Sequence, residues 1–265
     1  ILAKFFLPLI SYLNKMNYTW NFKPLPPQAT VIQLQQELNI SEPLAILLAQ
    51  RGITTFQQAK DFFRPTLSQL HNPFLMKGMK EAVARLDQAL KNNETILIYG
   101  DYDVDGTSAV SLMERYLSTF TSKLFTYLPD RYSEGYGISF QGIDYAKTQG
   151  CTLIIALDCG IKAIDKVQYA KEKGIDCIIA DHHRPSDQVP DAVAVLDPQQ
   201  ADCLYPYKEL CGCGLGFKLA QAYHEYLQRP FSELIPLLDL VAGATAADIV
   251  PMNGENRTLM YFGLD

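Results

Sequence analysis

The chain has 265 residues and a formal net charge of −6, with 48% hydrophobic and 20% charged residues. This length suits one large α/β domain with an appendage or two modest domains, and the composition excludes the disordered, collagen-like and coiled-coil classes. The acidic balance excludes a surface that holds nucleic acid by bulk positive charge alone, so an anionic substrate would need metal ions or a few placed Arg and Lys side chains.

The six cysteines lie in the second half of the chain, and none forms a Cys-x-x-Cys pair. This number is too small for a disulfide scaffold, so the simpler interpretation is a cytoplasmic protein in a reducing compartment. Cys211 and Cys213 have no further Cys or His at a matching metal-binding spacing. We interpret them as small loop residues before a helix.

The first residues include an apolar run at 5–10. The run is short, and no small-residue cleavage site of a signal peptide follows it. Met16 opens a polar stretch that is typical of a natural start, so we interpret residues 1–15 as an upstream segment. No stretch of about 18 apolar residues exists, which predicts no contact with a membrane.

Residues 31–91 carry apolar positions three and four apart, interrupted by Pro43, Pro65 and Pro73. This spacing predicts a small helical N-terminal module, which we bound at residues 16–92. The sequence does not indicate its function.

From Thr95 onward, short β-branched apolar runs alternate with amphipathic stretches. This alternation predicts an α/β domain over residues 93–265, with a mostly parallel sheet flanked by helices. The expected strands are 95–99, 123–128, 152–157, 176–180 and 192–196. The expected helices are 108–120, 140–148, 163–173, 217–227 and 231–247.

Acidic residues follow three of these strands and one later run of small residues. The acidic and histidine residues at these places are Asp101, Asp103, Asp105, Asp158, Asp181, His182, His183 and Asp248. In an open parallel sheet, ligands bind outside the carboxyl ends of the strands, so these side chains are expected to meet at one edge.

Carboxylates that converge in this way repel each other unless a cation is bound. Oxygen ligands with a single imidazole favour Mn²⁺ or Mg²⁺, and a central carboxylate such as Asp158 can bridge two ions in a site suited to phosphoryl chemistry. Each Asp taken alone is more often a helix cap or a turn residue. Taken together, the residues predict a metal site.

At these residues the chain resembles the DHH-family phosphoesterases. The four ordered motifs are GDYDVDG, ALDCG, DHH and GATAADIVP. Further matches are YLPDRYSEGYG, VAVLDP, CGCGLGFKLAQA and NGENRTLMYFGL, so the resemblance covers roughly residue 60 to the end. Within this family, the motifs resemble most specifically those of the exonucleases. It implies a hydrolase that degrades single-stranded DNA 5′→3′ to mononucleotides in repair and recombination.

The resemblance also implies two divalent ions. Asp103 and Asp158 would hold one, while Asp105, Asp158, His182 and Asp248 would hold the other.

Three positions qualify this assignment. Tyr99 stands where some relatives have a His, which implies a weaker first site completed by water. Asp101 is either a distal ligand or an acceptor that orients the turn. Asp239 competes with Asp248 for the fourth motif, and we prefer Asp248 because Asp239 lies in a helical context.

The remaining roles concern the substrate. His183 is expected to contact a non-bridging phosphate oxygen or the leaving group, and the alternative is that it orients Asp181. Asp181 itself is expected to orient His182 more than to bind metal. Arg131 is expected to grip a substrate phosphate, with a solvated Arg as the alternative. The expected catalytic set is Asp103, Asp105, Asp158, His182 and His183.

Two other functions stay open. One is a phosphoesterase of the same family acting on short oligonucleotides or cyclic dinucleotides, and the other is a non-catalytic scaffold with this fold. The chain looks truncated, since the resemblance implies later DHHA1 and OB-fold domains. It also implies single-stranded DNA as partner and, in a longer protein, a single-strand-binding protein and a helicase.

Overall fold

The computed structural model describes residue 19 and residues 21–265, so the predicted upstream segment 1–15 lies outside the described residues. The chain divides into two compact units between Arg64 and Pro65. In the described part of the chain, no helix has both the length and the apolar character needed to cross a bilayer.

The first unit is helical, as predicted. Its helices are α2 (Gln28–Leu38), α3 (Glu42–Ala49) and α4 (Phe56–Phe63). Asn39 ends α2 in a left-handed conformation, and the Thr55 side chain caps α4 by accepting a hydrogen bond from the Gln58 N–H. The small core of this unit consists of Val31, Leu34, Ala45, Leu48, Ile53 and Ala59.

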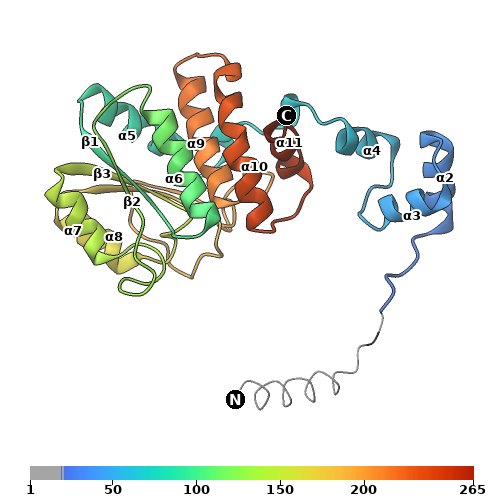
Figure 1. The fold of residues 1–265 in the computed structure, drawn as a ribbon, viewed down its shortest axis with the longest axis horizontal. Coiled ribbons are helices and arrows are strands. Elements are labelled where there is room, and N and C mark those ends of the chain that lie inside the picture. Colours follow the sequence, from blue (N-terminus) through green and yellow to red (C-terminus); the bar gives the residue numbers. More distant parts are fainter. Residues whose placement is uncertain (1–18, 20) are drawn as a thin grey trace, which may run out of the picture. The chain divides into compact units, whose positions relative to one another are not determined.

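The second unit contains a sheet and its covering helices (Figure 1). Its strands are β1 (Thr95–Gly100), β2 (Leu124–Tyr127), β3 (Cys151–Leu157), β4 (Asp176–Ala180) and β5 (Ala194–Leu196). Its α-helices are α5 (Met79–Lys91), α6 (Val104–Leu117), α7 (Phe140–Thr148), α8 (Ile164–Glu172), α9 (Gly212–Tyr226), α10 (Leu238–Ala247) and α11 (Gly254–Gly263). Three 3₁₀ helices are η1 (Leu67–Gln69), η2 (Pro73–Leu75) and η3 (Phe231–Leu237).

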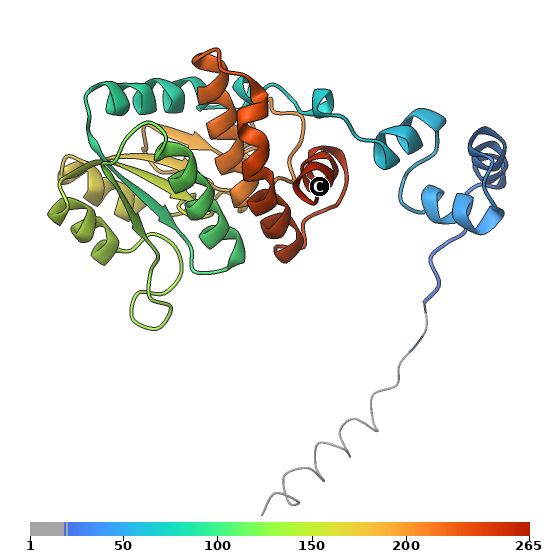
Figure 2. The same cartoon turned by 45° about the horizontal axis from the view of Figure 1, so that its top comes forward.

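The sheet is parallel throughout, with the strand order β2-β1-β3-β4-β5. Alternate residues of β1 enter two different cores: Ile96 and Ile98 pack on the side of α6 and α9, while Leu97 and Tyr99 pack on the side of α7 and α8. The two helical layers are visible from both directions in Figures 1 and 2. The predicted α/β class is confirmed, and the carboxyl ends of all five strands meet at one edge.

Two helices begin earlier than the sequence predicts, because a polar side chain caps each start. The Asp103 carboxylate accepts the Gly106 N–H, so α6 begins at Val104 and not at residue 108. Likewise Cys211 Sγ accepts the Gly214 N–H, and α9 begins at Gly212 and not at residue 217. The long helix predicted over 231–247 is divided into η3, which contains Pro236, and α10.

Helix α5 belongs to the second unit, although we assigned its residues to the N-terminal module. Met79, Val83 and Leu86 are buried in the core shared by the sheet and α9. Arg85 reinforces this packing, since its Nε donates to Asp176 Oδ2 at 2.6 Å, at the start of β4. The structural division at residue 64 therefore differs from the predicted boundary at residue 92.

A buried ion pair ties α9 to α11. Lys218 Nζ lies 3.1 Å from Glu255 Oε1, and both side chains are fully buried. Tyr205 donates its hydroxyl to Glu255 Oε2 at 2.6 Å, and Lys218 also donates to the His71 carbonyl at 2.7 Å. Burial lowers the pKa of Lys218, and the charge of Glu255 opposes this effect. Each charge is therefore tolerated because its partners are present.

We expect Lys218→Met to lower the free energy of unfolding by about 3–5 kcal/mol, because it leaves Glu255 charged and unpaired in the core. Adding Glu255→Gln should recover part of that loss. Urea unfolding followed by circular dichroism measures both effects. The exposed Lys77–Asp202 pair provides the control, since Lys77→Met should cost less than about 1 kcal/mol. Equal losses at the two pairs would contradict the prediction.

Candidate metal centre

The strand order brings the predicted acidic residues to one edge. Strands β1, β3 and β4 are neighbours in the sheet. Asp101 follows β1, Asp158 follows β3, and Asp181 follows β4 at the same level of the sheet. Helix α6 then adds Asp105 from its first turn, and Asp248 stands at the C-terminal end of α10.

Three carboxylate oxygens surround the Nε2 atom of His182. Asp158 Oδ1 lies 3.2 Å away, Asp248 Oδ2 3.6 Å and Asp105 Oδ2 3.8 Å. Both Asp158 Oδ1 and His182 Nε2 are buried without a hydrogen-bond partner. A shared cation satisfies such facing lone pairs, and carboxylates with one imidazole suit Mn²⁺ or Mg²⁺. These residues therefore fit a divalent ion.

A second group of ligand atoms overlaps the first. Nitrogen or oxygen atoms of Asp158, His182 and His183 lie within 4.8 Å of one another. His182 belongs to this group and also to the group it forms with Asp105 and Asp248, and Asp158 Oδ1 lies 3.2 Å from its Nε2. A carboxylate at this position can contribute to two neighbouring ions.

Asp158 occupies the most constrained position. Its backbone has a left-handed φ of 60°, and its N–H donates to the Ala180 carbonyl of β4 at 2.9 Å. Burial raises the pKa of Asp158, and the negative charges of Asp105 and Asp103 raise it further. Burial also raises the pKa of Asp248. The folded chain therefore holds these carboxylates close together at a cost that a bound cation would offset.

Asp103 and Asp101 are less directly placed. Asp103 is exposed and caps α6 through Oδ1, which lies 3.0 Å from the Gly106 nitrogen, and it joins neither ligand group. Asp101 is buried; its Oδ1 accepts the Gly137 N–H at 3.3 Å, and its Oδ2 has no partner. Burial raises the pKa of Asp101. Oδ1 of Asp101 thus orients the Gly137 turn, and Oδ2 is available to a distal ligand role.

The structure distinguishes the two candidates for the fourth motif. Asp248 faces His182, whereas Asp239 lies 3.8 Å from Arg115 in an exposed ion pair. This arrangement favours Asp248.

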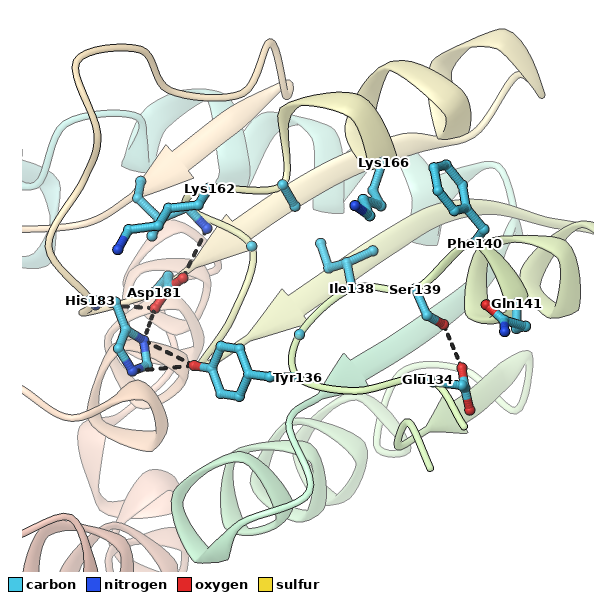
Figure 3. Close-up of a pocket in the computed structure, with 14 residues that line it drawn as sticks. Glu134, Tyr136, Ile138, Ser139, Phe140, Gln141, Lys162, Lys166, Asp181 and His183 are labelled. Atoms are coloured by element: carbon cyan, nitrogen blue, oxygen red, sulfur yellow. Dashed lines mark hydrogen bonds and ion pairs between the residues drawn. The ribbon is translucent and has the colours of Figure 1, made fainter. Parts of the chain in front are cut away.

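Asp181 orients His183, and not His182 as the sequence predicts. Its Oδ1 lies 2.7 Å from His183 Nδ1, and its Oδ2 accepts the Ile161 N–H at 2.8 Å. Figure 3 shows Asp181 and the Tyr136 hydroxyl converging on the His183 ring. The hydrogen bond between His183 Nδ1 and the accepting Asp181 carboxylate raises the pKa of His183. The His182 ring lies instead beside Asp158, with its Nε2 3.2 Å from Oδ1.

Tyr136 links this pair to the backbone of Asp158. Its hydroxyl lies 3.2 Å from the Asp158 carbonyl oxygen and 3.2 Å from His183 Nε2. Burial raises the pKa of Tyr136, so the hydroxyl stays protonated. Arg131 lies in the same loop, where its guanidinium stands over the Tyr102 ring at 5.2 Å.

A pocket of about 440 Å³ opens beside His183 (Figure 3). Tyr136, Ser139, Phe140, Lys162 and Lys166 contribute to its wall, together with the first turns of α7 and α8. The sequence did not single out this pocket, because its wall combines loops that are separate in the chain.

The sequence analysis did not predict two further features of the site, which concern Asp105 and Asp197. Asp105 accepts the backbone N–H groups of Gly212 and Cys213 at the start of α9. Asp197, at the end of β5, is fully buried, and its Oδ2 has no hydrogen-bond partner. The acid directly after the VAVL strand was the available signal for Asp197, and the three glycines of CGCGLG were the signal for a close approach.

Comparisons with known proteins agree with this geometry. A family model described as DHH family, N-terminal domain, matches residues 95–245. The chain is 42% identical over 240 residues to the single-stranded-DNA-specific exonuclease RecJ of Bacillus subtilis, an alignment covering 91% of this chain and 30% of that protein.

Two solved structures are also similar. One is RecJ in complex with Mn²⁺ from Thermus thermophilus, with a TM-score of 0.76 and 28% identity over 92% of this chain and 34% of that chain. The other is exonuclease RecJ bound to manganese, with a TM-score of 0.67 and 32% identity over 75% of this chain and 49% of that chain. The chain spans about a third of the length of the curated relatives it matches.

Replacing Asp158 with Asn tests the shared carboxylate, since Asn tolerates the left-handed backbone at this position. In chelator, we expect Asp158→Asn to raise the melting temperature, because it removes the cost of burying an acid beside Asp105 and Asp103. With Mn²⁺ at a hundred times its Kd, the parent should gain about 2.7 kcal/mol of stability and the variant less than about 1 kcal/mol. Thermal unfolding measures both. Asp239→Asn is the control and should gain as much from Mn²⁺ as the parent.

Asp197 predicts a pH dependence. Burial raises its pKa to about 7, so the folded chain keeps a proton that the unfolded chain, with a pKa of about 3.9, releases. This stabilisation is complete below about pH 4 and is lost as the pH rises through 7. Relative to the parent, Asp197→Asn should therefore gain up to about 3 kcal/mol between pH 4.5 and pH 8. Urea unfolding in chelator measures the difference, and a difference independent of pH would contradict the prediction.

Proposed function

The chain belongs to the DHH family, and we propose that it forms the catalytic part of a metal-dependent exonuclease that degrades single-stranded DNA 5′→3′ to mononucleotides. One observation carries the proposal: Asp158 Oδ1 and His182 Nε2 face each other at 3.2 Å, buried and without hydrogen-bond partners. The relatives described above are exonucleases, and two of their structures contain Mn²⁺.

In this proposal the chain holds two divalent ions, Mn²⁺ or Mg²⁺. Asp105, Asp158, His182 and Asp248 would hold one, and Asp103 with Asp158 would hold the other. When bound, such ions supply Lewis-acid stabilisation of the phosphorane-like charge and lower the pKa of a water nucleophile. The protein's contribution is to hold the carboxylates close together, and a bound cation would favour their ionised form.

His183 is proposed to act on the substrate phosphate. Asp181 holds its Nδ1 at 2.7 Å, which orients the ring and favours the protonated form. A protonated imidazole can donate to a non-bridging phosphate oxygen or pass a proton to the leaving oxygen. The Tyr136 hydroxyl, within 3.2 Å of the ring, would restrict its rotation.

Further groups are suited to holding the strand. We propose that Arg131 contacts a phosphate, since its guanidinium offers several donors and lies in an exposed loop close to Tyr136. The pocket beside His183 is large enough for part of a nucleotide, and Lys162 and Lys166 bring positive charge to its wall.

This chain spans about a third of the length of its curated relatives, so the proposal also concerns a longer protein. Because this chain is acidic, we propose that tight binding of a long strand needs parts beyond these residues, and that a single-strand-binding protein and a helicase act with the longer protein. All six cysteines are free and buried, which supports a cytoplasmic location.

The test is a digestion assay with Mn²⁺ and with Mg²⁺, using single-stranded DNA labelled at either end. We expect the 5′ label to appear directly as a mononucleotide, while the 3′-labelled strand shortens progressively. Duplex DNA and RNA should be cut at least tenfold more slowly. His182→Ala should lower the rate by at least a hundredfold, because the central ligand is lost.

Three results would overturn the proposal. Release of the 3′ label first would mean that degradation runs 3′→5′. Cleavage confined to dinucleotides or cyclic dinucleotides would indicate a small-substrate phosphoesterase. A rate unaffected by His182→Ala would place the chemistry elsewhere. The half-buried His71, whose ring packs edge-on against Tyr205, offers the matched control: His71→Ala should retain the rate of the parent.

A further inference from the structure

The first turn of α9 lies directly against the metal-ligand carboxylates. Gly212 N–H donates to Asp105 Oδ2 at 2.6 Å, and Cys213 N–H donates to Asp105 Oδ1 at 2.8 Å. These two N–H groups are among the four that a helix start leaves without intrahelical partners. Both oxygens of Asp105 are thus held by one helix end, and each keeps a lone pair for a cation.

Gly212 also abuts Asp158, on the other side of the same turn. A Cβ atom added to Gly212 would come within 2.4 Å of Asp158 Cβ and 2.6 Å of Asp158 Oδ1. No Cβ atom is tolerated at such distances, and the third atom it would meet, at 2.7 Å, is the backbone Cα of Asp158. The turn therefore touches both carboxylates, and it can do so because residue 212 has no side chain.

Cys211 joins this turn to the helix that carries the third carboxylate. Its Sγ accepts the Gly214 N–H at 3.4 Å and lies 3.6 Å from Thr245 Oγ1 of α10. Thr245 is three residues before Asp248, so both lie near the end of one helix. A single turn of backbone is in contact with the elements that supply Asp105, Asp158 and Asp248.

We propose that Cys211, Gly212 and Cys213 form a positioning element that sets the separation of Asp105 and Asp158, and thereby the affinity of the site for divalent ions. This inference deepens the proposed function. It rests on that proposal only in assuming that the site binds divalent ions. The two N–H groups fix the Asp105 carboxylate, and the positive end of the α9 dipole partly offsets the repulsion between the two acids before any ion arrives.

The decisive variant is Gly212→Ala. The added methyl group must push Asp158 and the helix start apart, so we expect the Kd for Mn²⁺ to rise at least tenfold. Electron paramagnetic resonance of free Mn²⁺, or calorimetric titration with Mn²⁺ alone, measures the Kd and the number of ions without any DNA. Gly216→Ala is the matched control, because its Cβ would meet only Leu157 Cδ2, at 3.4 Å. Its Kd should stay within twofold of the parent.

A second pair of variants covers the case in which Gly212→Ala does not fold. Cys211→Ala removes the cap without adding atoms, and we expect a rise in the Kd of three- to tenfold. Cys211→Ser keeps an acceptor for the Gly214 N–H and should restore binding to within twofold. Far-UV circular dichroism identifies the folded variants.

Unchanged Mn²⁺ binding in folded Gly212→Ala, or in Cys211→Ala should the former not fold, would overturn the inference. An equal loss in Gly216→Ala would overturn it as well, because a general disturbance of α9 would then explain the result. If the parent binds Mn²⁺ and responds to these variants but does not cleave DNA, the proposed function fails while the positioning role stands.

Discussion

Repulsion between buried carboxylates governs the arrangement of this protein. Asp105, Asp158 and Asp248 gather around one imidazole at the end of a parallel sheet, where water screens their charges poorly. The apolar faces of the sheet on either side supply the stability that holds them there. The amide groups of α9, the His182 ring and any divalent cation all act on the same unfavourable interaction.

The parts that sequence predicts well are those decided locally. Apolar β-branched runs define the five strands to within two residues at each end, and an acid placed after a strand has only one edge of a parallel sheet to reach. This reasoning pointed to Asp105, Asp158 and His182, the family resemblance added Asp248, and the structure places the three carboxylates around His182. Their roles as ligands remain our proposal.

Other features depend on tertiary contacts that no local pattern reveals. Helix α5 resembles the helices before it in periodicity, but Arg85 and its apolar face dock on the sheet. The partner of Asp181 depends on how two adjacent imidazoles turn after β4. The contact between Gly212 and Asp158 joins residues 54 positions apart, and only the packing of α9 against β3 creates it.

The left-handed backbone at Asp158 restricts which residues evolution could place there. Asn and Gly share this conformation at little cost, whereas Ala or a β-branched residue would add strain of about 1 kcal/mol or more. At this position the backbone alone admits few replacements for Asp, and of these Asn and Gly lose the carboxylate while keeping the turn. Loss of the charge and loss of the fold can therefore be separated at residue 158.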